Sequence, residues 1–250
     1  MKNDYRTDLF GKRLTELVVR AEKTGTKTFS DFVTPAEIPL CRHAAKEHAL
    51  TVTFQGGYPE AERVIAGFSD GPIEDEEFPI LAYEIKWPHQ KAPRHQDLLG
   101  GLMALGLSRA CTGDIIVMPE NAVLFIESKC RYIETMFSEA GGCHLQVTLL
   151  SKWPEIEPPK GITLHGNVSS LRLDAVMSEG YHLSRGDAVE RINAGNVKLN
   201  HVQVFKPDAR ILRGDVISLR GAGRLIVEEI GQPTKKDRLP LVLTRFGTSK

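Results

Sequence analysis

The chain has 250 residues and a formal net charge of zero, with 41% hydrophobic and 26% charged residues. This composition is typical of a globular protein, and the length is enough for two domains and a third small one. No apolar run approaches the roughly 18 residues that a membrane-spanning helix needs, and the first residues lack the apolar core of a signal peptide. We therefore expect a cytoplasmic protein without a membrane partner.

The spacing of cysteine and histidine argues against a metal site. The four cysteines are scattered and form no C-x-x-C pair, the arrangement typical of zinc ligands. His43 with His48, and His95 beside Asp97, lack a third ligand. We expect free thiols, packed or exposed histidines, and no metal or cofactor.

Residues 1–49 are predicted to form a small helical region. Apolar residues recur at three and four positions between Leu9 and Ala21, which is the period of an amphipathic helix. A second helix is expected to start at Thr34-Pro35-Ala36-Glu37, where Thr34 can cap the helix and Glu37 can complete a capping box.

Residues 50–150 are predicted to form a mixed domain. From residue 80 the expected elements follow the order β-α-β-β-α-β, near 80–87, 96–105, 114–118, 122–126, 130–140 and 144–150. This is the order of the ferredoxin-like fold and of RNA-recognition domains. Tyr83 and Phe125 are the aromatic residues that such a sheet could use to stack RNA bases. We interpret both as packing residues, because aromatic side chains are favoured in strands anyway.

Residues 151–162 are predicted to form a proline-rich linker. Three prolines and a glycine in this stretch disfavour a helix or a central strand. Trp153 is expected to hold the linker against a domain, and contact with a partner is the alternative.

Residues 163–250 are predicted to form a basic module of two short helices, a small antiparallel sheet and a C-terminal tail. Residues 169–250 hold 14 Lys and Arg against 9 Asp and Glu, a balance of +5 that leaves −5 for the rest of the chain. One helix follows Leu171-Arg172-Leu173-Asp174, and Ser184 suits the N-cap of the next, before Arg185. A hairpin with Asn200-His201 at its tip follows. A basic module on an acidic body favours a nucleic-acid partner.

This order of helices, glycine-rich turns and arginines resembles the RNA-binding domain named after ribosomal protein S4, and the whole chain is expected to be α+β. The resemblance implies that Arg172 and Arg185 are the leading RNA contacts. Arg185 lies beside a helix N-terminus, where a phosphate can bind. The supporting contacts that we expect are Ser184, Arg191, Lys198, Asn200, Arg220 and Arg224.

No catalytic motif stands out. The chain has no G-x-S-x-G elbow, no phosphate loop and no glycine-rich methyl-donor loop. Arg172-Leu173-Asp174 is similar to the catalytic aspartate segment of pseudouridine synthases, but it lies inside the S4-like module, so we interpret Asp174 as structural. The alternative is an RNA-modifying enzyme, pseudouridine synthase-like or methyltransferase-like, that reaches rRNA or tRNA through this module.

Three stretches of the body, together with the S4-like end, resemble the YlmH family of bacterial and plastid RNA-binding proteins. They are Gly57-Tyr58-Pro59-Glu60-Ala61-Glu62-Arg63, residues 95–109, and Gly113-Asp114-Ile115-Ile116-Val117. Gln96 stands where the family usually has arginine, so Arg109 is the remaining candidate for RNA contact in the middle domain.

The resemblance to the YlmH family implies a non-catalytic factor without a cofactor. Such a factor binds the large ribosomal subunit through rRNA and tRNA, and it stabilises stalled peptidyl-tRNA in ribosome-associated quality control. We expect the free protein to be a monomer.

Overall fold

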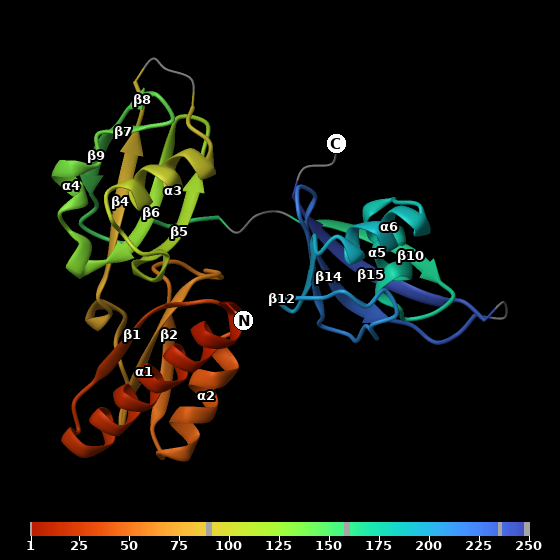
Figure 1. Ribbon diagram of the computed structural model, residues 1–250, viewed down its shortest axis with the longest axis horizontal. Helices are drawn as coiled ribbons and strands as arrows, with labels where there is room; N and C mark the ends of the chain where they lie inside the picture. The colour runs from red at the N-terminus through yellow and green to blue at the C-terminus, as the bar shows by residue number, and fades with distance from the viewer. Residues whose placement is uncertain (1, 89–91, 158–160, 235–236, 248–250) are drawn as a thin grey trace. The chain divides into compact units, whose positions relative to one another are not determined.

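The computed structural model describes residues 2–88, 92–157, 161–234 and 237–247, and the chain forms two compact units that divide between residues 158 and 159. Both units contain helices and strands (Figure 1), so the predicted α+β class is confirmed. No helix in the described part of the chain is long and apolar enough to cross a bilayer.

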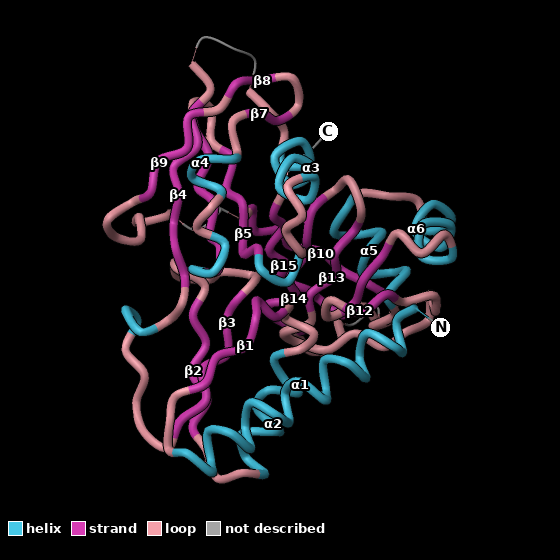
Figure 2. Tube along the Cα trace, turned by 60° about the vertical axis from the view of Figure 1, so that its left-hand side comes forward, coloured by secondary structure: helices cyan, strands magenta, loops and turns pink. Residues whose placement is uncertain are grey.

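The first part of unit 1 is a three-stranded sheet with two helices, whereas the sequence predicts a small helical region for residues 1–49. Its elements are α1 (Lys2–Thr24), β1 (Thr28–Val33), α2 (Ile38–Glu47), β2 (Thr51–Gln55) and β3 (Val64–Ser69). The strands are antiparallel in the order β1-β3-β2, and both helices lie along them (Figure 2). The boundary expected at residue 49 therefore falls inside one packed substructure.

Buried polar residues explain why β1 gives no strand pattern in the sequence. Thr28 and Ser30 are buried, although polar residues are usually exposed. The hydroxyl of Ser30 accepts a hydrogen bond from the N–H of Ala66 in β3 at 2.9 Å. A buried polar side chain with a hydrogen-bond partner on another strand can take an inward-facing position of β1. The alternation of apolar and polar residues that predicts a strand is therefore missing from this segment.

Helix α2 begins at Ile38 and not at the predicted start, Pro35. The expected contact between Thr34 and Glu37 does form, since a carboxylate oxygen of Glu37 accepts hydrogen bonds from the N–H and the hydroxyl of Thr34 at 2.7 and 2.8 Å. These bonds close a turn that precedes the helix, and a different proline, Pro39, lies in its first turn.

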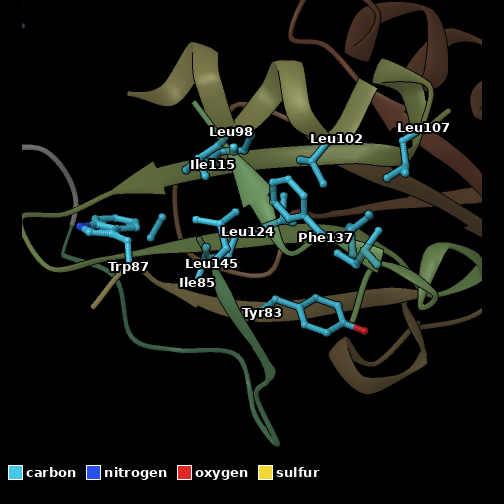
Figure 3. Close-up of a cluster of buried hydrophobic side chains, with 14 of the residues drawn as sticks. Tyr83, Ile85, Trp87, Leu98, Leu102, Leu107, Ile115, Leu124, Phe137 and Leu145 are labelled. Carbon is cyan, nitrogen blue, oxygen red and sulfur yellow. The ribbon is translucent and has the colours of Figure 1, made fainter. Parts of the chain in front are cut away.

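The middle of the chain has the predicted ferredoxin-like arrangement. In chain order it contains β4 (Ile80–Lys86), α3 (His95–Ala104), β5 (Thr112–Val117), β6 (Asn121–Glu127), α4 (Ile133–Met136) and β9 (Gln146–Leu149). The strands form an antiparallel sheet in the order β5-β6-β4-β9. Leu98 and Leu102 of α3 pack over the sheet against Ile115 and Leu124 (Figure 3).

Helix α4 is shorter than the helix predicted for residues 130–140. A 3-10 turn, η3 (Ser128–Cys130), precedes it, and β7 (Glu139–Ala140) follows and pairs with β8 (Cys143–His144). Two further 3-10 turns are η1 (Asp75–Glu77) and η2 (Arg109–Cys111).

The face of the middle sheet opposite α3 is buried by the N-terminal sheet. Val123 and Phe125 of β6 pack there with Phe32 and Ile65. The ring of Tyr58 stacks on Phe125 with 5.2 Å between the ring centroids. RNA-recognition domains use this face to stack bases, and in this chain the protein itself occupies it.

Both strand aromatics of the middle sheet are packing residues, as the sequence indicated. Tyr83 lies in the core beneath α3 and Phe125 in the core on the other face, and each is 0% exposed. Trp153 of the predicted linker also joins the second core, and its ring N–H donates to the carbonyl of Ile80 at 3.2 Å. The expectation that Trp153 holds the linker against a domain is thus confirmed.

Arg63 connects the two sheets of unit 1. It is only 6% exposed, and its guanidinium donates to the carbonyl of Thr112 at 2.8 Å and to the carbonyls of Phe32 and Arg109 at 2.9 Å each. A buried charge is tolerated when hydrogen bonds satisfy it. Arg63 therefore stabilises the junction between the sheets.

Asp114 reinforces the same junction from the other side. One of its carboxylate oxygens accepts hydrogen bonds from the hydroxyl of Tyr58 at 2.9 Å and from the N–H of Glu62 at 2.7 Å. Residues 57–63 and 113–117, which carry part of the family resemblance, thus meet at this junction.

Unit 2 packs two helices against a six-stranded sheet. Its elements are β10 (Ile162–Val168), α5 (Leu173–Tyr181), α6 (Arg185–Asn193), β11 (Val197–Leu199), β12 (Val202–Gln203), β13 (Val216–Leu219), β14 (Gly223–Ile230) and β15 (Leu239–Phe246). The strands are antiparallel in the order β10-β15-β14-β13-β11-β12, and α5 and α6 lie together beside them (Figure 1). β15 lies inside this sheet, where the sequence predicted a tail.

Replacing Arg63 by alanine should destabilise unit 1 by about 3 kcal/mol, because three hydrogen bonds of a buried guanidinium are lost. Both tryptophans of the chain, Trp87 and Trp153, belong to unit 1, so tryptophan fluorescence during urea unfolding reports on this unit. The exposed Arg131→Ala is the control, with an expected change within about 0.5 kcal/mol. Equal urea midpoints for the two variants would show that Arg63 does not hold the junction.

Candidate nucleic-acid interface

Two arginines predicted to bind RNA lie at the starts of the two helices of unit 2. Arg172 is the N-cap residue of α5, and Arg185 is the first residue of α6. Ser184 caps α6 as predicted, since its hydroxyl accepts a hydrogen bond from the N–H of Asp187 at 3.1 Å. The positive ends of the two helix dipoles add to the positive potential at these starts.

A single carboxylate, that of Asp174, holds both arginines. Its side chain is 4% exposed. Arg172 forms a two-bond pair with it, at 3.1 and 2.9 Å, and Arg185 donates to it at 3.2 Å. The side chains of Arg172 and Arg185 remain 44% and 50% exposed. The interpretation of Asp174 as a structural residue agrees with these contacts.

The charges around Asp174 fix its ionisation. Burial alone would raise the pKa of this carboxyl, but the hydrogen bonds from Arg172 and Arg185 outweigh burial, so its pKa lies below the usual value. Asp174 is therefore an anion at neutral pH. It orients the two guanidinium groups and leaves their remaining N–H groups for another acceptor, such as a phosphate.

Arg210 is a third arginine near the start of α5, and it was missed from the sequence. It lies opposite Arg172 in an antiparallel bridge. The N–H of Leu173 donates to the carbonyl of Ala209 at 2.9 Å, and the N–H of Ile211 donates to that of Leu171 at 2.8 Å. Arg172 and Arg210 thus form a non-hydrogen-bonded antiparallel pair, in which the two Cα atoms are about 4.5 Å apart. We call Arg172, Arg185 and Arg210, with Asp174, the helix-start cluster.

Asn200, expected to support RNA binding, has a structural role. Asn200 and His201 form the tip of the β11–β12 hairpin as predicted, with φ of 48° and 67°, the left-handed values of a type I′ turn. The side chain of Asn200 donates to Asp215 at 2.8 Å and accepts from the N–H of Val216 at 2.9 Å. Its polar atoms thus fasten the hairpin to β13.

The other predicted RNA contacts do not belong to one site. Arg191 is exposed on α6. Lys198 is exposed on β11, and Arg220 is exposed directly after β13. Arg224 is half-buried, with its guanidinium 4.7 Å from the centroid of the Phe246 ring. Lys198 and Arg224 lie on the face of the sheet opposite α5, since their neighbours in β11 and β14 are buried. The predicted set therefore divides into two surfaces.

Arg109 differs from the expectation of an RNA contact in the middle domain. Its guanidinium donates to the carbonyls of Thr112 and Gly113 at 2.9 Å each, and its own carbonyl accepts from Arg63. Burial lowers the pKa of Arg109, and the negative charge of Asp114 partly opposes this shift. These contacts place Arg109 in the junction of unit 1 and account for it without RNA.

One cavity of unit 1 has an acidic lining that does not suit a nucleic acid. It has a volume of about 480 Å³, and Glu60, Asp75 and Glu155 are among its lining residues. Carboxylates repel phosphate.

Among the described residues, no group of three His, Cys, Asp or Glu side chains could hold a metal ion. Burial raises the pKa of Cys41 to about 12, so this thiol is a weak nucleophile.

Family models match two parts of the chain. Residues 73–152 match a family described as "Putative RNA-binding domain in YlmH", and residues 171–217 match the S4 domain. The second match contains all of the helix-start cluster.

Two known proteins are similar over much of the chain. The "Ribosome-associated protein quality control protein P2" of Bacillus subtilis (strain 168) is 30% identical over 222 residues, which is 86% of each chain. The structure of the "Cell division protein ylmH from Streptococcus pneumoniae" matches with a TM-score of 0.52 and 18% identity, over 58% of this chain and 91% of that one. The second likeness bears on the fold alone.

The lowered pKa of Asp174 predicts how unit 2 loses stability in acid. A carboxyl whose pKa falls on folding stabilises the fold above its unfolded pKa of about 3.9, and this contribution is lost as pH falls through the folded pKa. Asp174→Asn should be less stable than the unaltered protein at pH 7 by about 1–3 kcal/mol. The difference should shrink below about pH 4.

Amide hydrogen exchange of the buried residues Val176 and Ile192, followed by NMR from pH 7 downward, measures this difference. Glu190→Gln, which neutralises an exposed carboxylate of α6, is the control. A constant difference between Asp174→Asn and the unaltered protein at every pH would contradict the assigned ionisation.

Proposed function

This chain belongs to the YlmH family of S4-domain RNA-binding proteins, and from this premise we propose that it is a non-catalytic factor that binds the large ribosomal subunit. It contacts rRNA and tRNA through unit 2 and stabilises stalled peptidyl-tRNA in ribosome-associated quality control. The name of the Bacillus subtilis relative, with 86% of each chain aligned, supports this role. We place the protein in the cytoplasm, on the ribosome, and infer that it is a monomer when free.

The observation that carries the proposal is the helix-start cluster. Arg172 and Arg185 are each bonded to Asp174 and still about half exposed. An arginine that is already oriented loses less conformational entropy when it binds a phosphate. Arg210, which lies opposite Arg172 in the antiparallel bridge, adds a third positive charge.

The architecture of unit 1 supports a positioning role for that unit. The sheet face that an RNA-recognition domain would use is packed against Phe32, Ile65 and Trp153. Arg109, the candidate for RNA contact there, donates to backbone carbonyls. We therefore assign the RNA contacts to unit 2.

Arg172→Ala and Arg185→Ala should each weaken binding to purified large ribosomal subunits about tenfold or more, because each removes a charge-assisted hydrogen bond to a phosphate. The slope of log affinity against log salt should fall by about 0.9 for each duplex phosphate that the variant no longer neutralises. Co-sedimentation at several salt concentrations measures both quantities, and circular dichroism checks that the variants are folded.

Arg238→Ala is the matched control, since Arg238 is an exposed arginine of unit 2 in the loop before β15. It should leave the affinity within about twofold, as expected for a charge that makes no RNA contact. Unchanged affinity and salt slope for both Arg172→Ala and Arg185→Ala would overturn the proposed interface.

Two further measurements address the finer parts of the proposal. Large subunits that carry peptidyl-tRNA should bind the protein more tightly than empty ones, and the peptidyl-tRNA should dissociate more slowly in its presence. Mass spectrometry of rRNA and tRNA from cells lacking the gene should show no missing modified nucleotide. A nucleotide modification that disappears would contradict the non-catalytic assignment and favour an RNA-modifying enzyme.

A further inference from the structure

The sheet of unit 2 has a second face with a composition of its own. Ile217, Leu219, Leu225 and Val227 are buried on the side of α5, where the hydroxyl of Tyr181 donates to the carbonyl of Ile217 at 2.8 Å. Side chains of a strand alternate between the two faces. The residues between those buried positions therefore lie on the opposite side, which we call the outer sheet face.

Strand pairing places a continuous row of side chains across this face. Lys198 pairs with Gln203 on one side and with Ser218 on the other, Ser218 pairs with Arg224, and Arg224 pairs with Phe246. Five strands about 4.8 Å apart give the row a length of about 19 Å. The row contains two cations and an aromatic ring and no acidic residue.

An exposed phenylalanine stands beside this row. Phe205 is two residues beyond Gln203, so it lies on the same side as Lys198, and it is 57% exposed. Its ring lies over Gly195, about 3.1 Å from the place that a Cβ there would occupy. The exposed ring of Phe205 offers a flat surface on which a nucleic-acid base can stack.

Arg220 adds a third cation to the face, beside Lys198 and Arg224 of the row. The N–H of Arg220 donates to the carbonyl of Asn196 at 3.0 Å, which places Arg220 next to the Phe205 end of the hairpin. Arg224 lies over the ring of Phe246. A guanidinium held in this way can stack on a base with its other side.

We propose that the outer sheet face is a second RNA-binding site, specific for single-stranded RNA, separate from the helix-start cluster. One base stacks on Phe205, and Lys198 and Arg220 bind the phosphates beside it. Arg224 offers a second stacking plane. This proposal rests on the proposed RNA-binding function and gives unit 2 two places to hold RNA, one for a backbone and one for unpaired bases.

Charge and shape favour RNA over a protein partner. Protein interfaces have an apolar centre in which charged residues are depleted. The outer sheet face instead has one exposed ring, with Lys198 and Arg220 near it and Arg224 farther along the row. Stacking of a base on an aromatic ring combined with cations for the backbone is typical of single-strand binding.

The full chain should be titrated with an unstructured RNA of about ten nucleotides, within the usual range of single-strand sites. Phe205→Ala should weaken binding about tenfold with an unchanged salt slope, because a base loses its stacking partner and no charge is removed. Lys198→Ala should lower the salt slope by about 0.7 for a single-strand phosphate contact. Phe205→Tyr, which keeps a ring, should bind as the unaltered protein does.

Val202→Ala is the matched control, since Val202 is also an exposed apolar residue of the hairpin, at 59%, but lies on the other side of the strand. It should leave the affinity unchanged. Phe205→Trp should also show fluorescence quenching upon RNA addition beyond that of Trp87 and Trp153 in the unaltered protein.

The proposal is overturned if Phe205→Ala binds the RNA as the unaltered protein does, or if Val202→Ala loses as much affinity. It is also overturned if Phe205→Ala weakens ribosome binding but not RNA binding, because the face would then contact a protein. The proposed function fails separately, through Arg172→Ala and Arg185→Ala with intact ribosome binding. The two failures can therefore be told apart.

Discussion

The buried carboxylate of Asp174 is the constraint on which the RNA-binding unit depends. A buried anion is tolerated only with counter-charges and hydrogen bonds, and Arg172 and Arg185 supply both. Because one arginine comes from the start of α5 and the other from the start of α6, the pair can form only when the two helices pack correctly. The packing of the two helices therefore also orients the two arginines.

This arrangement explains why the arginines are suited to phosphate. A guanidinium has five N–H donors in a fixed plane, and Asp174 uses only some of them. The arginine side chains stay about half exposed, so the pairing with Asp174 orients them without covering them. The two long side chains lose conformational entropy during folding, so less is lost when they bind a phosphate.

Unit 1 shows that the strand order of an RNA-recognition domain does not by itself leave the sheet face open to a ligand. Its middle domain has the strand order of RNA-recognition domains, yet Phe125 on the relevant face stacks with Tyr58. Arg63 and Asp114 fix the N-terminal sheet against it. Residues 57–63 and 113–117, which carry part of the family resemblance, contribute to this junction. A sequence motif alone does not tell a structural junction from a binding site.

Most local signals were read correctly from the sequence, although α2 begins later and α4 is shorter than predicted. Contacts between distant segments were not foreseen. Caps, hairpin tip and the ferredoxin-like order depend on neighbouring residues, and Ser184, Asn200 and the middle strands follow them. β1 pairs with the distant β3, and β15 pairs with the distant β10. Local sequence does not show which distant segment a strand will pair with. Arg210 was missed for the same reason, since only the return of its segment beside Arg172 brings it to the helix-start cluster.

A structure of the protein bound to the large ribosomal subunit, determined by electron cryo-microscopy, tests the central claim most directly. We expect the guanidinium groups of Arg172 and Arg185 to lie within hydrogen-bond distance of RNA phosphate oxygens while both keep their contact with Asp174. An RNA contact made elsewhere on the chain, with both arginines facing solvent, would contradict the account.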